Sequence, residues 1–329
     1  MAQNTVKKRT IEGKRSDKET TKNVDEKRTS DGNKDKNEDE LVKPKYGPHV
    51  TFPYQRVWSR CVLIVGVMLI VWYNSKAGKE VALAQRRDVL MGRTAEVRCS
   101  PEYRADLGKF PGCVPEKCAR VVTDKLLTAG EIDALLRIAG AGFEHGESDG
   151  GASTLDLQTG ALSKGLQFVD AFKIHRQRDI FRQEDFAAFK VVRTKIQSAI
   201  AHHFGVDVKS IYLTYPTFFS KITNKSAKRI HDEYWNPHID KDSYESFHYT
   251  ALLYLNDYGE DFKGGRFIFI DQNNVNTTVE PRKGRVLMFT SGKENLHAVE
   301  KVTSGTRMAF TVAFTCDKKF ATPDPPLKK

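Results

Sequence analysis

Residues 307–315, RMAFTVAFT, predict a β-strand with two unlike faces. Side chains alternate between the two faces of a strand, so the large apolar residues share one face and Arg307 shares the other with small residues. The two sets are Met308, Phe310, Val312 and Phe314, and Arg307, Ala309, Thr311 and Ala313. We expect the large face to pack on a core and Arg307 to stand over a cavity, where its planar guanidinium suits a carboxylate.

Other runs rich in β-branched and aromatic residues lie upstream of this strand. They are IYLTYPTFFSKI (211–222), YTALLYLN (249–256), GGRFIFID (264–271), GRVLMFT (284–290) and NLHAVEKV (295–302). Two helices are predicted before them, over 126–140, with a capping-box pattern at Thr128 and Glu131, and over 184–205, ending at Gly205. Gly-rich residues 142–160 predict a loop. The fold class is therefore α+β, with helices packed on one sheet of a β-sandwich or barrel.

We predict that the rest of the chain forms segments outside this domain. Residues 1–50 hold thirteen Lys or Arg, ten Asp or Glu and almost no apolar residues, which predicts a disordered tail. An apolar segment over 57–77 includes Trp58 and Trp72 and stands between polar stretches, so it predicts a transmembrane signal-anchor rather than a buried core segment. We predict a stem or linker over 78–120, the folded domain over 121–320 and a C-terminal tail over 321–329. Because basic residues are interleaved with acidic ones, the net charge of +11 does not indicate nucleic-acid binding.

The orientation of the predicted span is not decided by charge, because basic residues flank both of its ends. Asn224 and Asn276 begin N-glycosylation acceptor triplets, which favour a luminal C-terminal part. Outside the span, which contains Cys61, the four cysteines are compatible with two disulfides in an oxidising compartment. They are Cys99, Cys113, Cys118 and Cys316. Within this set, a local bond between Cys113 and Cys118, or free thiols, is favoured over a zinc site. We therefore expect a single-pass type II membrane protein facing the ER or Golgi lumen.

Residues 230–242, IHDEYWNPHIDKD, contain two candidate halves of a metal site. His231-Asp232-Glu233 and His238-Ile239-Asp240 each place a histidine two residues before a carboxylate. A facial-triad iron site needs two imidazoles and one carboxylate, and His297 is the distant histidine that could complete it. His248 could also face the metal. The paired His202 and His203, at the end of the second predicted helix, are interpreted as structural.

With these residues, the sequence resembles the Fe(II)- and 2-oxoglutarate-dependent dioxygenases of the prolyl 4-hydroxylase type. The resemblance covers residues 121–320, and the residues that carry it are His238-Ile239-Asp240, YTALLYLND, Gly264-Gly265, His297 and Arg307. It implies a double-stranded β-helix, or jelly roll, in which His238, Asp240 and His297 ligate Fe(II). It also implies that Arg307, where collagen prolyl hydroxylases usually carry Lys, binds the distal carboxylate of 2-oxoglutarate together with Tyr254. By the same pattern His238-Asp240 is preferred to the first triplet, and His231 borders the substrate groove or is exposed.

The resemblance further implies a reaction in which O2 and 2-oxoglutarate yield succinate and CO2 while a prime substrate is hydroxylated, with L-ascorbate keeping the iron reduced. A luminal position favours a prolyl or lysyl side chain of a secretory-pathway protein as the substrate. The alternative is a catalytically silent jelly-roll binding module in the secretory pathway. A metal-independent structural protein is the third possibility, and it has the least support from the residues.

Overall fold

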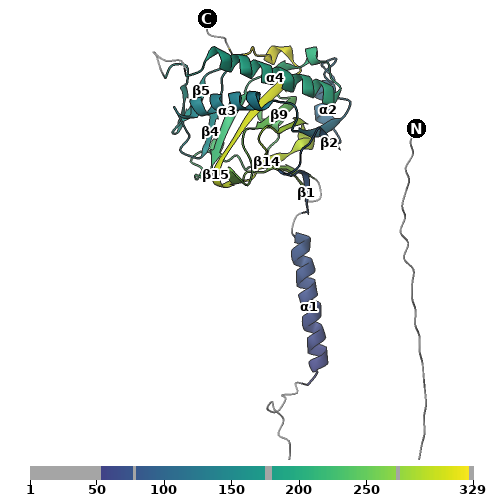
Figure 1. Ribbon diagram of the computed structural model, residues 1–329. Helices are drawn as coiled ribbons and strands as arrows, with labels where there is room; N and C mark the ends of the chain where they lie inside the picture. The colour runs from purple at the N-terminus through teal and green to yellow at the C-terminus, as the bar shows by residue number, and fades with distance from the viewer. Residues whose placement is uncertain (1–52, 77–78, 175–179, 272–274, 326–329) are drawn as a thin grey trace, which may run out of the picture. The chain divides into compact units, whose positions relative to one another are not determined.

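The computed structural model describes residues 53–76, 79–174, 180–271 and 275–325 (Figure 1). The chain divides into two units, Met1–Gly66 and Val67–Lys329, at a point inside the first helix, α1 (Gln55–Lys76). In the described residues α1 is the one helix long and apolar enough to cross a membrane, and none of its apolar stretch is buried by protein. It coincides with the predicted span over 57–77 as far as residue 76. The predicted tail over 1–50 lies outside the described residues.

The described residues form two sheets, and the larger one has eleven strands that all pair antiparallel. Its order is β2-β3-β13-β9-β15-β8-β4-β5-β6, and β7 and β10 also pair with β15. The bounds are β2 (Arg93–Val97), β3 (Cys118–Thr123), β4 (Ala152–Leu155), β5 (Ala161–Lys164), β6 (Gln167–Asp170), β7 (Tyr212–Leu213), β8 (Phe218–Thr223), β9 (Tyr249–Tyr254), β10 (Phe262–Gly264), β13 (Val286–Thr290) and β15 (Val302–Thr315). The predicted loop over 142–160 therefore includes a strand, β4, which pairs with both β8 and β5.

A second sheet of four strands covers the inner face of the first. Its order is β1-β12-β11-β14, with bounds β1 (Lys79–Ala84), β11 (Phe267–Ile270), β12 (Val275–Val279) and β14 (His297–Val299). Apolar side chains of both sheets share one buried cluster, which includes Phe269 and Val279 from the small sheet and Leu252, Leu287 and Ala309 from the large one. The pairings are antiparallel apart from that of β1 with β12, which is parallel, and the packing of the two sheets fits the barrel of the predicted jelly roll.

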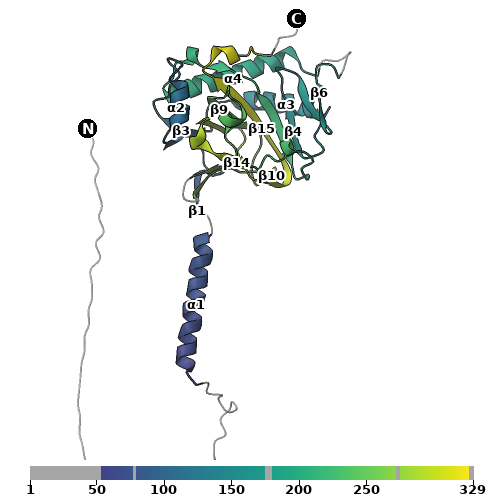
Figure 2. The ribbon, with the colours of Figure 1, turned by 180° about the vertical axis from the view of Figure 1, so that it is seen from behind.

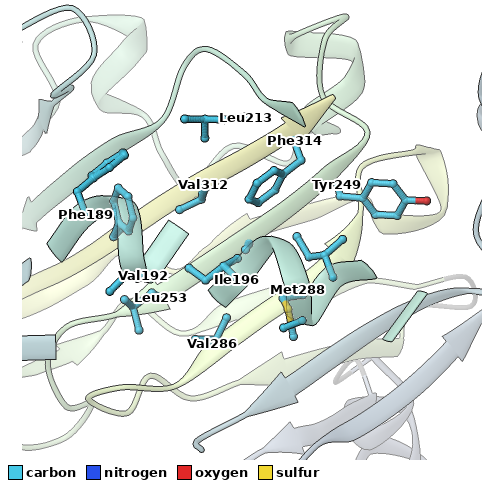
Figure 3. Packing of buried hydrophobic residues seen from close by; sticks show 14 of the residues in the cluster. Phe189, Val192, Ile196, Leu213, Tyr249, Leu253, Val286, Met288, Val312 and Phe314 are labelled. Atoms are coloured by element: carbon cyan, nitrogen blue, oxygen red, sulfur yellow. The ribbon is translucent and has the colours of Figure 1, made fainter. Parts of the chain in front are cut away.

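Helices α3 (Ala129–Phe143) and α4 (Gln183–Phe204) pack together over the outer face of the large sheet (Figures 1 and 2). Figure 3 shows Phe189, Val192 and Ile196 of α4 among the side chains of β9, β13 and β15. The predicted capping box is present, because Thr128 accepts from the Glu131 N–H and Glu131 accepts from the Thr128 N–H. Gly205 ends α4 in the left-handed conformation, with φ of 67°. The predicted α+β class and both predicted helices are confirmed.

The predicted stem over 78–120 is wrong, because this segment forms part of the sheets. Strand β1 pairs with β12, and β2 pairs with β3, which in turn pairs with β13. The short helix α2 (Pro101–Leu107) buries Tyr103 and Leu107 in the main core. The sequences of β1 and β2 are charged and short, so these strands are stabilised by pairing with distant strands rather than by a local apolar pattern. The folded domain therefore begins near residue 79 and not at 121.

Two disulfides join this N-terminal part to the domain. Cys99 bonds to Cys118, and Cys113 bonds to Cys316, whereas Cys61 in α1 is free. The expected local pairing of Cys113 with Cys118 is wrong, although the number of disulfides is as expected. At the other end of the chain, Ala321 pairs with Thr214, and Asp324 forms an ion pair with Arg193 of α4. The predicted C-terminal tail over 321–329 is therefore attached to the domain as far as its described residues extend.

Candidate metal centre

His238, Asp240 and His297 come together at one end of the small sheet. His297 begins β14, which is labelled in Figure 2, and the segment before the short helix α5 (Asp240–Ser243) pairs with it. The His238 N–H donates to the His297 carbonyl at 2.9 Å and the His297 N–H donates to the His238 carbonyl at 3.0 Å. Pro237 favours an extended backbone before this pair. Two residues 59 positions apart in the sequence are thus fixed side by side by backbone hydrogen bonds.

The possible ligand atoms of these three residues all lie within 4.8 Å of one another. Asp240 Oδ1 is 3.7 Å from His238 Nε2 and 3.5 Å from His297 Nε2. In the described parts of the chain, this is the only group of three or more His, Cys, Asp or Glu side chains close enough to hold a metal ion. Two imidazoles and one carboxylate are the donor set of a facial-triad iron site.

The hydrogen bonds of the two histidines prepare the Nε2 atoms for a metal. His238 Nδ1 lies 3.0 Å from the Asn236 carbonyl, and His297 Nδ1 lies 2.8 Å from the Asn295 carbonyl. Because a carbonyl oxygen only accepts, we assign the proton of each neutral ring to Nδ1, which leaves the Nε2 lone pair free. Both lone pairs therefore belong to the atoms that face Asp240, as metal-binding histidines require.

The two histidines differ in exposure. His297 is 3% exposed and its ring stacks on Phe267 with centroids 4.8 Å apart. Burial lowers the pKa of His297 below its ordinary value, which favours the neutral ring that can bind a metal. The His238 side chain is 41% exposed. One side of the cluster is therefore packed against protein and the other is open to solvent, as a site that admits other ligands needs.

Arg307 and Tyr254 form a second polar group inside the barrel. Both are fully buried, and the Arg307 Nε–H donates to the Gly265 carbonyl at 2.9 Å. Gly265 has a φ of 70°, and a Cβ there would lie 3.0 Å from the Arg307 side chain, so both the backbone conformation and the space call for glycine. Among the described residues, Arg307 Nη2 and the Tyr254 hydroxyl have no hydrogen-bond partner.

These two unpaired donors fit a carboxylate ligand. Burial raises the pKa of Tyr254 to about 12, so its phenol keeps the proton that it can donate. Burial also lowers the pKa of Arg307, but a guanidinium remains charged at neutral pH. A buried cation and a neighbouring hydroxyl without acceptors are costly unless an anion binds there. The distal carboxylate of a dicarboxylic acid would supply the missing acceptor.

The first histidine triplet does not join the cluster. His231 is exposed, and Asp232 is buried against the chain itself, where its carboxylate accepts from Ser148 Oγ and from the Lys228 and Arg229 N–H groups. These bonds hold the loop before the metal cluster, so Asp232 has a structural role. Glu233 accepts from the Asn236 side chain at 2.7 Å.

Three other histidines named from the sequence also lie outside the cluster. His248 is buried, and its Nε2 lies 3.1 Å from Asp106 Oδ2 and 3.1 Å from Lys241 Nζ. The possibility that it faces the metal is therefore wrong. His202 and His203 are in the last turn of α4 with their ring centres 5.2 Å apart.

Several residues around the site were not found from the sequence. Thr250 Oγ1 lies 2.6 Å from Asp240 Oδ2, and Ser291 Oγ lies 2.8 Å from Thr250 Oγ1. On the other side, the buried Arg120 donates to the Asn295 side chain at 2.7 Å and forms an ion pair with Asp271. No sequence motif predicts such contacts of single Thr, Ser, Arg and Asn residues, so these four residues could not be identified from the sequence.

Comparison with known proteins now decides the family. Residues 226–315 match the model of the 2OG-Fe(II) oxygenase superfamily, a range that contains the whole cluster and Arg307. The Mus musculus 2-oxoglutarate and iron-dependent oxygenase domain-containing protein 3 is 49% identical over 281 residues, which cover 83% of this chain and 89% of that protein. The chain belongs to the 2OG-Fe(II) oxygenase superfamily. The human relative of the same name is 47% identical over 280 residues, covering 83% of this chain and 87% of the relative.

A more distant relative is Rattus norvegicus prolyl 3-hydroxylase 1, which is 26% identical over 222 residues, or 62% of this chain and 30% of that protein. The family resemblance drawn from the sequence is thus confirmed. As a 2OG-Fe(II) oxygenase, the protein is a 2-oxoglutarate-dependent dioxygenase, whose reaction requires Fe(II), 2-oxoglutarate and O2.

Proposed function

We propose that this oxygenase hydroxylates a prolyl or lysyl side chain of a protein substrate. In the balanced reaction, substrate C–H, 2-oxoglutarate and O2 give substrate C–OH, succinate and CO2. The observation that carries this proposal is the pairing of a His-Asp-His cluster, whose Nε2 lone pairs are free, with a buried Arg307 and Tyr254 that lack an acceptor. The prolyl 3-hydroxylase relative supports a protein side chain as the substrate class.

In this proposal His238, Asp240 and His297 hold Fe(II). Three protein ligands on one face of the ion leave positions for 2-oxoglutarate and O2. Iron held there supplies the O2 chemistry of the family. The chain's own residues hold both histidines in the required tautomer, and they exclude water from the His297 side through Phe267. L-ascorbate is proposed to keep the iron reduced.

Arg307 and Tyr254 would bind the distal carboxylate of 2-oxoglutarate. The hydrogen bond from Arg307 to the Gly265 carbonyl fixes the guanidinium, so its remaining N–H groups are oriented before the ligand arrives. A preorganised cation and phenol in a buried site bind an anion more strongly than the same groups in water. They would thereby place the cosubstrate in one orientation relative to the metal cluster.

We further propose that the protein is a single-pass type II membrane protein whose catalytic domain lies in the ER or Golgi lumen. Helix α1 supports the anchor, and the two disulfides support an oxidising compartment. Asn224 is exposed after β8, so an oligosaccharide could be attached there. Asn276 is half-buried in β12, between β1 and β11, and should remain unmodified.

The orientation is tested by expressing the full chain in cultured cells and treating it with a glycosidase that removes N-linked glycans. We expect a mobility shift that disappears in Asn224→Gln and persists in Asn276→Gln. A protein without any glycan whose domain is digested by protease added to intact microsomes would show the opposite orientation.

The substrate class is tested by mass spectrometry of secretory proteins from cells that lack the gene product, with either the unsubstituted protein or His238→Ala restored. A prolyl or lysyl residue that gains one oxygen atom only with the unsubstituted protein supports the proposal. Oxygen gained on a small molecule or lipid, with unchanged proteins, would contradict it. A protein that binds metal but never forms succinate would favour the silent binding module.

A further inference from the structure

The two oxygens of the Asp240 carboxylate have different surroundings. Oδ1 faces the metal cluster, 3.7 Å from His238 Nε2 and 3.5 Å from His297 Nε2. Oδ2 is 2.6 Å from Thr250 Oγ1. Thr250 and Ser291 are 3% and 1% exposed, so both hydroxyls lie inside the protein. Bulk water therefore cannot replace Asp240 as their hydrogen-bond partner.

The proton count fixes the direction of these hydrogen bonds. A hydroxyl group has one proton to donate, and an ionised carboxylate can only accept. The Thr250 hydroxyl therefore donates to Asp240 Oδ2, and its oxygen is left as an acceptor. Ser291 Oγ, 2.8 Å from Thr250 Oγ1, must then donate to Thr250. The result is a directional chain from Ser291 through Thr250 to Asp240, which ends in a short, charge-assisted hydrogen bond.

The segments that carry Thr250 and Ser291 also fix the backbone next to Asp240. Thr250 lies on β9, and Ser291 directly follows β13, its neighbour in the large sheet. The Ser291 N–H donates to the His248 carbonyl at 3.0 Å, and the Ser291 carbonyl accepts from the Lys241 N–H at 3.1 Å. Ser291 thus contacts both the residue after Asp240 and the hydroxyl that contacts its side chain. Backbone and carboxylate are oriented by one rigid sheet.

We propose that Thr250, supported by Ser291, is a positioning residue that makes Asp240 a ligand through Oδ1 alone. This inference rests on the proposed metal site. A free carboxylate can rotate and bind a cation through both oxygens, which would fill a coordination position that the cosubstrate or O2 needs. With Oδ2 held by Thr250, only Oδ1 is presented to the metal, and the remaining positions stay open.

The test uses the full chain in detergent and Co(II), a redox-inert substitute for Fe(II) whose visible absorption reports coordination. Thr250→Val keeps the shape but removes the hydroxyl, Thr250→Ser keeps the hydroxyl, and Ser291→Ala removes the second hydroxyl. Thr217→Val is the matched control for the loss of a buried hydroxyl, because Thr217 is fully buried and its hydroxyl donates to the Thr214 carbonyl and not to Asp240. Calorimetry gives the Co(II) affinity, and circular dichroism verifies folding.

We expect Thr250→Val to weaken Co(II) binding by about 10- to 100-fold and to change the absorption spectrum. Ser291→Ala should weaken it by about 2- to 10-fold, and Thr250→Ser and Thr217→Val should match the unsubstituted protein. If Thr250→Val fails to fold, Ser291→Ala and Thr250→Ser decide by the same criteria. Unchanged affinity and spectrum in the variants that lose a hydroxyl would overturn this inference alone. Absence of Co(II) binding by the unsubstituted protein would overturn the metal site as well.

Discussion

The guanidinium carbon of Arg307 lies 5.3 Å from the centre of the Tyr254 ring, and each residue buries a polar atom without a hydrogen-bond partner in the described structure. Unpaired buried polar atoms destabilise a folded protein, typically by about 1–3 kcal/mol each. The two atoms lie side by side at the position predicted for cosubstrate binding. This indicates that the protein without cosubstrate is less stable because these groups are kept available for the ligand.

Substituting Tyr254 with Phe separates stability from binding. Removal of an unpaired buried hydroxyl should stabilise the cosubstrate-free protein by about 1 kcal/mol in urea unfolding. The same change should weaken 2-oxoglutarate binding by about 10-fold or more in calorimetry with Mn(II), because a hydrogen bond to a carboxylate is lost. Tyr249→Phe is the control, for which the expected change in the free energy of unfolding has the opposite sign. Its hydroxyl donates to the Cys113 carbonyl at 2.8 Å, so its loss should destabilise the protein and leave 2-oxoglutarate affinity unchanged. Equal effects of both substitutions would contradict this assignment.

The two disulfides should contribute unequally to stability. In the chain-entropy description, a cross-link stabilises more when it closes a longer loop. Cys99–Cys118 spans 19 residues and Cys113–Cys316 spans 203. Replacing both cysteines of a pair by Ala should therefore cost about 3 kcal/mol for the first and about 5 kcal/mol for the second. Urea unfolding of the two double variants measures the difference, and a larger loss from the Cys99–Cys118 pair would contradict the expectation.

His248 should make stability depend on pH. The ring is buried; the Cys316 N–H lies 3.1 Å from its Nδ1, and its Nε2 lies 3.1 Å from both Asp106 Oδ2 and Lys241 Nζ. Burial, followed by the charge of Lys241, lowers the pKa of His248 to about 4. The unfolded chain binds a proton near pH 6.5, but the folded protein does so only near pH 4. The contribution of the neutral ring is thus complete above about pH 6.5 and is lost as pH falls toward 4, by about 3 kcal/mol.

Urea unfolding of the metal-free protein at pH 7, 5.5 and 4 measures this effect, with His248→Gln as the comparison. The free energy of unfolding should fall more steeply with acid in the unsubstituted protein than in His248→Gln. Parallel curves would show that His248 does not titrate between the two states in this range.

The parts of the fold that were predicted from sequence have strong local patterns. The alternation in 307–315 placed Arg307 inside the barrel and Phe310 and Phe314 on the helix-covered face, as the structure has them. Period-two alternation is set by strand geometry, so it survives without knowledge of the partner strands.

The parts that were missed depend on partners far away in the sequence. Strands β1 and β2 have charged, half-exposed sequences and are defined by their pairing with β12 and β3. The pairing of Cys113 with Cys316 depends on how the whole chain folds, since four cysteines allow three pairings. Likewise, nothing near Thr250 in the sequence indicates that its hydroxyl meets Asp240.

We propose that His238, and not His231, belongs to the iron centre. His231 is a matched control, because it lies seven residues earlier in the same segment and is exposed. The direct measurement is succinate formation from 2-oxoglutarate by the full chain with Fe(II), O2 and ascorbate, without a prime substrate. We predict slow turnover by the unsubstituted protein, equal turnover by His231→Ala, and none by His238→Ala when both variants are folded. Retained turnover in His238→Ala, or its loss in His231→Ala alone, would contradict the account.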